Sequence, residues 1–101
     1  MRLMVMFDLP TITSNDRRNY RQFRKKLLTD GFIMMQESIY TCLTVDGQSA
    51  NLLKKKVALY APSKGLIQAM VITEKQFSKM EYISGIKDTS PANSSERFIV
   101  L

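Results

Sequence analysis

The opening of the chain constrains its fold more than any other segment. Residues 3–10 read Leu-Met-Val-Met-Phe-Asp-Leu-Pro, an apolar run with one carboxylate, Asp8, near its end. Such a run is typical of a central strand that is covered on at least one face. Pro10 ends it, because proline lacks the N–H that a sheet ladder needs. We therefore expect a strand over 2–8 that carries Asp8 to the lip of a sheet.

The rest of the chain alternates extended and helical segments in the order β-α-β-β-α-β. This order, in a single domain over residues 1–101, indicates a ferredoxin-like α+β fold built on a split βαβ unit. The segments follow from apolar periodicity and from turn residues such as Gly and Pro. We expect, after the first strand, a helix over 16–30, strands over 32–36 and 38–44, a helix over 48–61 and a strand over 66–73.

Spacing within the two long helices predicts their ends and their buried faces. Thr13, Ser14 or Asn15 can cap the first helix, and Gly31 can end it. Apolar residues that recur every three or four positions define the face that turns toward the core. The expected buried positions are Tyr20, Phe23 and Leu27, with Leu28 beside them, in the first helix, and Leu52, Leu53, Val57 and Tyr60 in the second.

The last part of the chain is a C-terminal extension of the core. Residues 1–85 form the expected core, and residues 86–101 form a loop and a strand. Because a lone apolar strand at a terminus exposes an unpaired edge, we expect it to pair with a second subunit across a two-fold axis. The segments are a capped helical turn over 73–77, a short strand over 80–84, a polar loop over 86–96 and a strand over 97–101.

Composition narrows the chemistry that the protein can perform. The chain carries 15 Lys and Arg against 9 Asp and Glu, and its net charge of +6 favours a polyanionic partner such as nucleic acid. No histidine and a single cysteine, Cys42, exclude a structural zinc site and a histidine-based triad. The lone thiol and the lack of a signal pattern or an apolar run of roughly 20 residues predict a cytoplasmic protein without a membrane span.

Two basic clusters are candidates for phosphate contact. Arg17, Arg21 and Arg24 are spaced so that they share one helix face. Arginine forks bind pairs of phosphate oxygens, and few acidic residues at helical spacing neutralise either cluster. The alternative is a solvated helix face with no ligand. The candidate nucleic-acid-binding residues are Arg17, Arg18, Arg21, Arg24, Lys25 and Lys26 in the first cluster and Lys54, Lys55 and Lys56 in the second.

Asp8 is the candidate metal ligand and the candidate catalytic residue. One carboxylate holds magnesium weakly, so two copies of Asp8 facing each other across a dimer axis would make a better site. A metal held there could polarise a phosphodiester and activate water. The alternative is a strand-end carboxylate that caps the next segment or pairs with an arginine. An antiparallel return strand would also bring Ser38, most simply a turn former, near Asp8.

Several motifs together resemble the family of small CRISPR-associated adaptation proteins called Cas2, in its type II-A form. The resemblance spans essentially the whole chain. The segments that carry it are Phe7-Asp8-Leu9-Pro10, the basic helix closed by Gly31-Phe32, Gln36-Glu37-Ser38-Ile39-Tyr40, Thr73-Glu74-Lys75-Gln76-Phe77 and Asn93-Ser94-Ser95-Glu96-Arg97.

The resemblance implies a ferredoxin-like homodimer with exchanged C-terminal strands, which bridges two CRISPR integrase dimers and holds a duplex DNA prespacer by its phosphates. It places the conserved aspartate of the family on Asp8, with one Mg²⁺ or Mn²⁺ per dimer between the two Asp8 side chains. Members have been described as metal-dependent ribonucleases or deoxyribonucleases, whereas integration chemistry belongs to the integrase. Type II-A relatives are expected to continue beyond Leu101, with integrase contacts in that tail.

Two other classes of protein compete with this interpretation. An RNA-recognition module shares the strand order, but it stacks bases on aromatic residues of its central strands. The strand over 66–73 has no aromatic residue, which argues against such a module. A regulatory dimer that binds a small ligand is the other alternative, and it would show no salt-dependent DNA binding.

Overall fold

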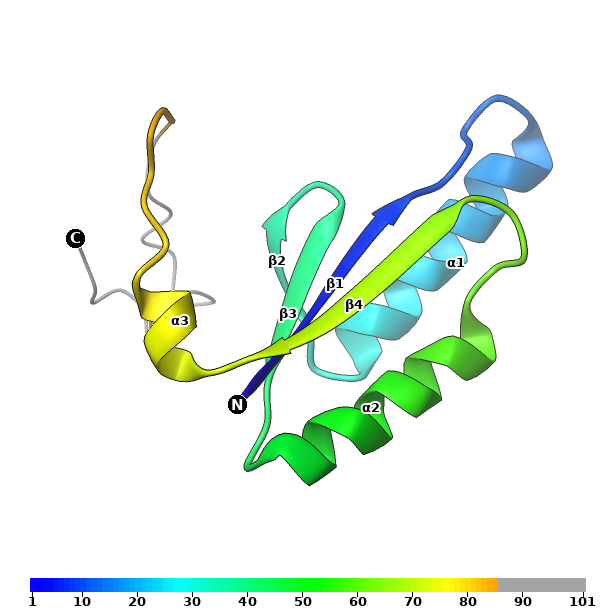
Figure 1. Ribbon diagram of the computed structural model, residues 1–101. Coiled ribbons are helices and arrows are strands. Elements are labelled where there is room, and N and C mark those ends of the chain that lie inside the picture. The colour runs from blue at the N-terminus through cyan, green and yellow to red at the C-terminus, as the bar shows by residue number, and fades with distance from the viewer. Residues whose placement is uncertain (86–101) are drawn as a thin grey trace.

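A four-stranded antiparallel sheet forms the framework of the protein (Figure 1). The computed structural model describes residues 1–85, so the expected loop over 86–96 and strand over 97–101 lie outside the described residues. The strand order is β2-β3-β1-β4, with β1 in the centre as expected. The strands are β1 (Arg2–Asp8), β2 (Ile33–Gln36), β3 (Ile39–Leu43) and β4 (Leu66–Ile72).

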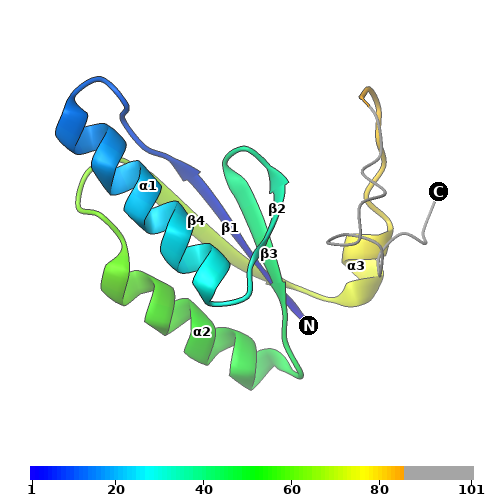
Figure 2. The ribbon, with the colours of Figure 1, turned by 180° about the vertical axis from the view of Figure 1, so that it is seen from behind.

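Two long helices cover one face of this sheet, and Figure 2 shows them in front of it. They are α1 (Ser14–Thr29) and α2 (Gly47–Tyr60), each within two residues of its predicted bounds. A short helix, α3 (Glu74–Ser78), follows β4 and corresponds to the predicted capped turn. Together these elements form the predicted ferredoxin-like α+β fold.

The first helix begins where its sequence provides a cap. The Thr13 hydroxyl accepts a hydrogen bond from the backbone N–H of Asp16 at 3.0 Å, and the Asp16 carboxylate accepts one from the backbone N–H of Thr13 at 3.2 Å. This reciprocal pair satisfies two backbone donors that the helix start would otherwise leave open. Asp30 caps the other end, and Gly31 follows with φ +95°, a conformation that glycine adopts without strain.

The core lies between the helices and the sheet. Alternate residues of β1 point into it, namely Leu3, Val5 and Phe7. The Phe7 ring contacts the rings of Tyr20, Phe23 and Tyr40, with centroids 5.8, 5.1 and 5.6 Å away. The remaining buried members of the core are Leu9, Leu27, Phe32, Ala50 and Val57, with Leu53 and Tyr60 partly buried beside them.

Two of the expected buried positions, Leu52 and Leu28, are exposed. Leu52 is 61% exposed, because Ala50 and Val57 turn toward the core and Leu52 lies on the opposite side of α2. A helix advances about 100° per residue, so neighbouring Leu53 is partly buried while Leu52 reaches solvent. Leu28, beside the buried stripe of α1, is also exposed.

The opposite face of the sheet is apolar and largely open. The alternation of β1 places Arg2, Met4, Met6 and Asp8 on this face. On the neighbouring strands, Leu43, Leu66 and Met70 are 58%, 57% and 54% exposed, in register with Arg2, Asp8 and Met4. We call this surface the open face.

The predicted strand over 80–84 is not formed. Met80 to Ser84 follow α3 as irregular chain, with no ladder to any strand of the described residues. Together with Met35 and Gln36 of β2 they line a groove of about 270 Å³. Strand propensity alone was misleading here, because a strand also needs a backbone partner in register.

Candidate functional site

Asp8 stands at the end of the central strand, as predicted. It is exposed and pairs in register with Leu66 of β4. The preceding residue, Phe7, donates its N–H to the carbonyl oxygen of Ser38 at 3.0 Å. Ser38 therefore contacts the residue that precedes Asp8, and it lies in the β2–β3 turn as its residue type suggested.

The backbone at Asp8 is held by a close approach of Gly65. Gly65 has φ +92°, and a Cβ atom placed on it would lie 2.7 Å from the carbonyl oxygen of Asp8. The same Cβ would lie 2.7 Å from Cδ2 of Leu9. Only glycine fits there, so the start of β4 closes tightly over the end of β1.

The donor set around Asp8 suits a hard cation only in part. Within residues 1–85, no group of three or more His, Cys, Asp or Glu side chains gathers at one place. An exposed carboxylate fits the oxygen-ligand preference of magnesium, but it supplies only one of the roughly six ligands that the ion takes. A single copy of the chain therefore supplies one of the two carboxylates that the predicted paired site requires.

The six predicted cations of α1 are all exposed, but they do not form one surface. Arg17, Arg21 and Arg24 share one side of the helix by their spacing. Lys25 and Lys26 lie toward α2 with Gln22 and Thr29, where all four line a groove.

The cations of α1 differ in their partners. Arg17 donates to the backbone carbonyls of Thr11 and Ile12 at 3.2 and 2.8 Å, so part of its guanidinium is already engaged. Arg18, Arg21, Arg24 and Lys25 make no ion pair with any other residue in the described part of the chain. These four side chains keep their full charge for an external anion.

The three lysines of α2 also differ in whether they form an ion pair. Lys54 and Lys55 are exposed, whereas Lys56 pairs with Asp30 at 2.9 Å. The Tyr60 hydroxyl donates a second hydrogen bond to Asp30 at 3.0 Å. The ammonium of Lys56, and then the Tyr60 hydroxyl, hold the pKa of Asp30 below its usual range against the effect of burial. Asp30 and Tyr60 were not predicted as site residues, since neither stands out by charge pattern.

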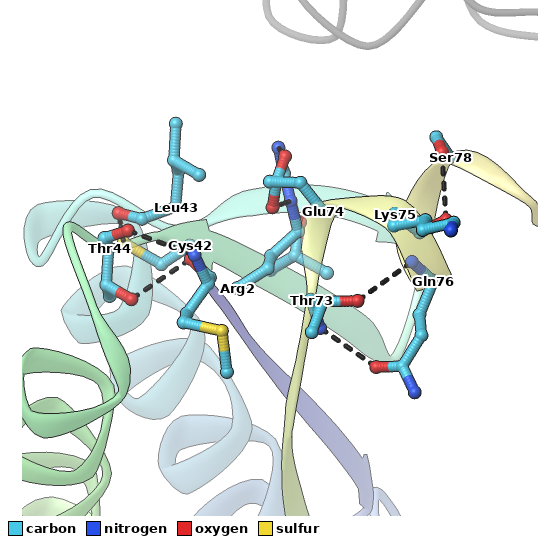
Figure 3. A network of polar contacts seen from close by, with 11 residues as sticks. Arg2, Cys42, Leu43, Thr44, Thr73, Glu74, Lys75, Gln76 and Ser78 are labelled. Carbon is cyan, nitrogen blue, oxygen red and sulfur yellow. Dashed lines mark hydrogen bonds and ion pairs between the residues drawn. The ribbon is translucent and has the colours of Figure 1, made fainter.

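Arg2, also missed by the sequence reasoning, anchors α3 at the other end of the open face (Figure 3). Its guanidinium is 3% exposed and donates twice to Glu74, at 2.9 Å each. The same group stands 4.0 Å from the centre of the Phe77 ring. Glu74 and Phe77 lie more than 70 positions from Arg2 in the sequence, so no local motif indicated these contacts.

The remaining reactive side chain is Cys42. It is half-buried on β3, and burial raises the pKa of its thiol. A protonated thiol is a poor nucleophile, so nothing favours cysteine chemistry here.

These features define a small basic ferredoxin-like protein with an open apolar face and an exposed carboxylate at the end of its central strand. The comparisons with known proteins agree with that class. The family model for CRISPR associated protein Cas2 matches residues 1–80. The chain belongs to the Cas2 family.

Full-length relatives support this membership. A protein of Ligilactobacillus salivarius named CRISPR-associated endoribonuclease Cas2 is 46% identical, with 100% of both chains covered. A Streptococcus mutans protein of the same name is 44% identical over 100% of this chain and 93% of its own. The streptococcal relative is therefore longer than the 101 matched residues, whereas the lactobacillal relative is not.

A solved structure supports the fold. The crystal structure of Streptococcus pyogenes Cas2 superposes with a TM-score of 0.62 at 20% identity, covering 83% of this chain and 100% of that one. None of the helices within residues 1–85 combines the length and the apolar character that a membrane crossing requires.

Proposed function

We propose that this protein acts in CRISPR spacer acquisition as a homodimer that holds duplex DNA by its phosphates and bridges dimers of the CRISPR integrase. The observation that carries the proposal is the row of exposed, unpaired cations on α1, in a chain whose net charge is +6. Arginine on a rigid helix suits phosphate oxygens, and such contacts bind DNA without reading its sequence.

The basic surface extends beyond α1. Lys54 and Lys55 on α2 add two further cations, and neither pairs with an acidic residue of the described chain. Binding of this kind releases counterions, so the affinity for duplex falls steeply as salt rises. A regulatory dimer that binds a small ligand would not show this salt dependence.

The open face supports the homodimer. Leu43, Leu66 and Met70 expose more than half of their surface there, beside the side chains of Met4 and Met6. Apolar surface of this extent on one side of a sheet is typical of an interaction site. A second copy bound on this face would leave α1 and α2 of both subunits exposed to DNA, because the helices cover the opposite face.

Duplex binding is tested by fluorescence anisotropy at several salt concentrations. We expect Arg18→Gln with Arg21→Gln to weaken binding and to reduce the slope of log affinity against log salt by about 1 for each phosphate that the variant no longer neutralises. The matched control is Lys75→Gln with Lys79→Gln, which removes the same charge from α3 and its C-cap. Unchanged duplex affinity in the α1 variant would sink the proposal.

The integrase contact is tested by mixing the protein with its cognate integrase and a short duplex. We expect a complex whose mass contains one homodimer between two integrase dimers, and integration that requires the duplex-binding residues. Wild type and Asp8→Ala should integrate equally, since the chemistry of integration is assigned to the partner. A protein that stays a monomer, or integration that proceeds without it, contradicts the proposal.

A second candidate function is a metal-dependent endonuclease that uses paired Asp8 residues. It is favoured by the exposure of Asp8 and by its rigid backbone against Gly65. The names of the relatives, endoribonucleases, point the same way. One Mg²⁺ or Mn²⁺ between the two Asp8 side chains would polarise the phosphodiester and activate water.

The test is cleavage of RNA and DNA with and without Mg²⁺ or Mn²⁺. Activity should vanish in Asp8→Ala and should persist in Asp46→Ala, which removes an acidic residue at the N-cap of α2. Cleavage that survives Asp8→Ala would show that the activity comes from a contaminant or from another site.

A further inference from the structure

Helices α1 and α2 lie side by side on one face of the sheet (Figure 2). A groove lined by both helices opens on this helical side of the protein. Its volume is about 500 Å³. Sites for small molecules enclose roughly 300–1,000 Å³, so the groove has the size of such a site. Lys25, Lys26 and Asp30 line it from α1 and its C-cap, and Lys56 and Tyr60 line it from α2.

The charge of the groove favours an anion. Asp30 is satisfied by Lys56 at 2.9 Å and by the Tyr60 hydroxyl at 3.0 Å, so this carboxylate has no need of a cationic ligand. Lys25 and Lys26 form no ion pair with any residue among the first 85. The C-terminus of α1 contributes a partial charge of about −0.5, which leaves the sum of three ammonium groups and one carboxylate positive.

An aromatic wall stands beside these cations. The Lys26 ammonium lies 5.6 Å from the centre of the Tyr60 ring. The ring is held from within by Phe23, whose centroid is 5.8 Å away, and by the hydrogen bond to Asp30. A phosphate at Lys26 would therefore have a rigid aromatic surface next to it, which a planar ring of the same ligand can contact.

We propose that this groove binds a phosphate-bearing ligand of nucleotide size, with the phosphate on Lys25 and Lys26 and the base against Tyr60. The inference goes beyond duplex binding. A duplex keeps its bases stacked and presents only its backbone, whereas the groove has room for the base as well. The ligand is a free nucleotide or an unpaired nucleotide at the end of a strand.

The experiment titrates the protein with AMP while calorimetry gives the affinity and NMR follows the Tyr60 ring protons. We expect saturable binding with a dissociation constant of about 1 mM or tighter and a shift of the Tyr60 signals. Adenosine and inorganic phosphate, which each lack one half of the ligand, should bind more weakly than AMP. A 5′-phosphorylated single-stranded tetranucleotide distinguishes the two sources, and the proposal stands whichever source binds better.

Two charge-matched variants test whether AMP binds at the lysines of the groove rather than at any basic surface. Lys25→Gln with Lys26→Gln should weaken AMP binding roughly tenfold or more, the scale of one charge-assisted hydrogen bond. Lys54→Gln with Lys55→Gln removes the same charge from α2 outside the groove, and it should change the affinity less than about twofold. Thermal melting checks that both variants remain folded.

Three results would overturn the proposal. The first is no saturation and no Tyr60 shift by about 10 mM AMP. The second is an equal loss of affinity in both variants, and the third is inorganic phosphate binding as tight as AMP binding. Duplex anisotropy on the wild-type protein keeps this outcome separate from the proposed function, since duplex binding can persist when AMP binding is absent.

Discussion

Gly65 lies directly against Asp8, so that a Cβ atom on Gly65 would stand 2.7 Å from the carbonyl oxygen of Asp8. This contact joins the start of β4 to the end of β1 and sets where the exposed carboxylate is presented. It involves backbone atoms, which cannot move aside as the end of a flexible side chain can.

Gly65→Ala should therefore destabilise the protein by roughly 1–3 kcal/mol, from the positive φ and the collision together. Gly31→Ala is the matched control, since Gly31 has φ +95° but its nearest contact is the Sγ of Cys42 at 3.8 Å. Urea unfolding of both variants isolates the collision as the difference between them. Equal losses would mean that the approach of Gly65 to Asp8 is not tight.

Tyr40, which is buried, and Tyr60, which is partly buried, should respond oppositely to loss of the hydroxyl. The Tyr40 hydroxyl is buried with no partner at hydrogen-bond geometry, and burial raises its pKa although the charge of nearby Arg24 opposes the shift. Because phenylalanine removes a buried polar group that makes no well-formed hydrogen bond, Tyr40→Phe should be neutral or stabilising by up to about 1 kcal/mol. Tyr60→Phe breaks the bond to Asp30 and should cost about 1 kcal/mol. Thermal unfolding of the two variants side by side checks the sign of each change.

Asp30 should make part of the stability dependent on pH. Its pKa is lowered in the folded protein below the ordinary value of 3.8, chiefly by the hydrogen bond from Lys56. A carboxyl group of this kind stabilises the fold above its unfolded pKa, and the contribution is lost as pH falls through the folded pKa. Between about pH 5 and pH 3 the wild type should lose more stability than Asp30→Asn, which does not titrate. Parallel curves for the two proteins in urea titrations would contradict this role.

Glu74 should contribute more to the stability of the fold than its partial exposure suggests. It receives two hydrogen bonds from Arg2, whose guanidinium is buried. Removing the carboxylate leaves that cation without its best partner, so Glu74→Ala should cost about 1–2 kcal/mol. Lys75→Ala, on the same short helix, should change stability by less than about 0.5 kcal/mol. A double-mutant cycle with Arg2→Met measures the coupling, and a coupling near zero would refute the anchor.

Local chemistry let the sequence predict most of the fold. The apolar run before Pro10 predicted the central strand, and the polar residues at 13–15 predicted the start of α1 to within two residues, because these signals act between near neighbours. The position of Asp8 at an exposed strand end followed from the same run. The spacing of Arg17, Arg21 and Arg24 was likewise enough to place them on one side of a helix.

The tertiary structure alone determined the contacts between residues that meet only after the chain has folded. The approach of Gly65 to Asp8, the pairing of Arg2 with Glu74 and the contact of Asp30 with Lys56 and Tyr60 each join distant segments. The packing of α2 on the sheet also decided that Leu53 is partly buried while Leu52 is exposed. The packing of the two helices placed Lys25 and Lys26 in the groove toward α2. Sequence periodicity determines which side chains share a face, but the docking of one element on another decides what that face meets.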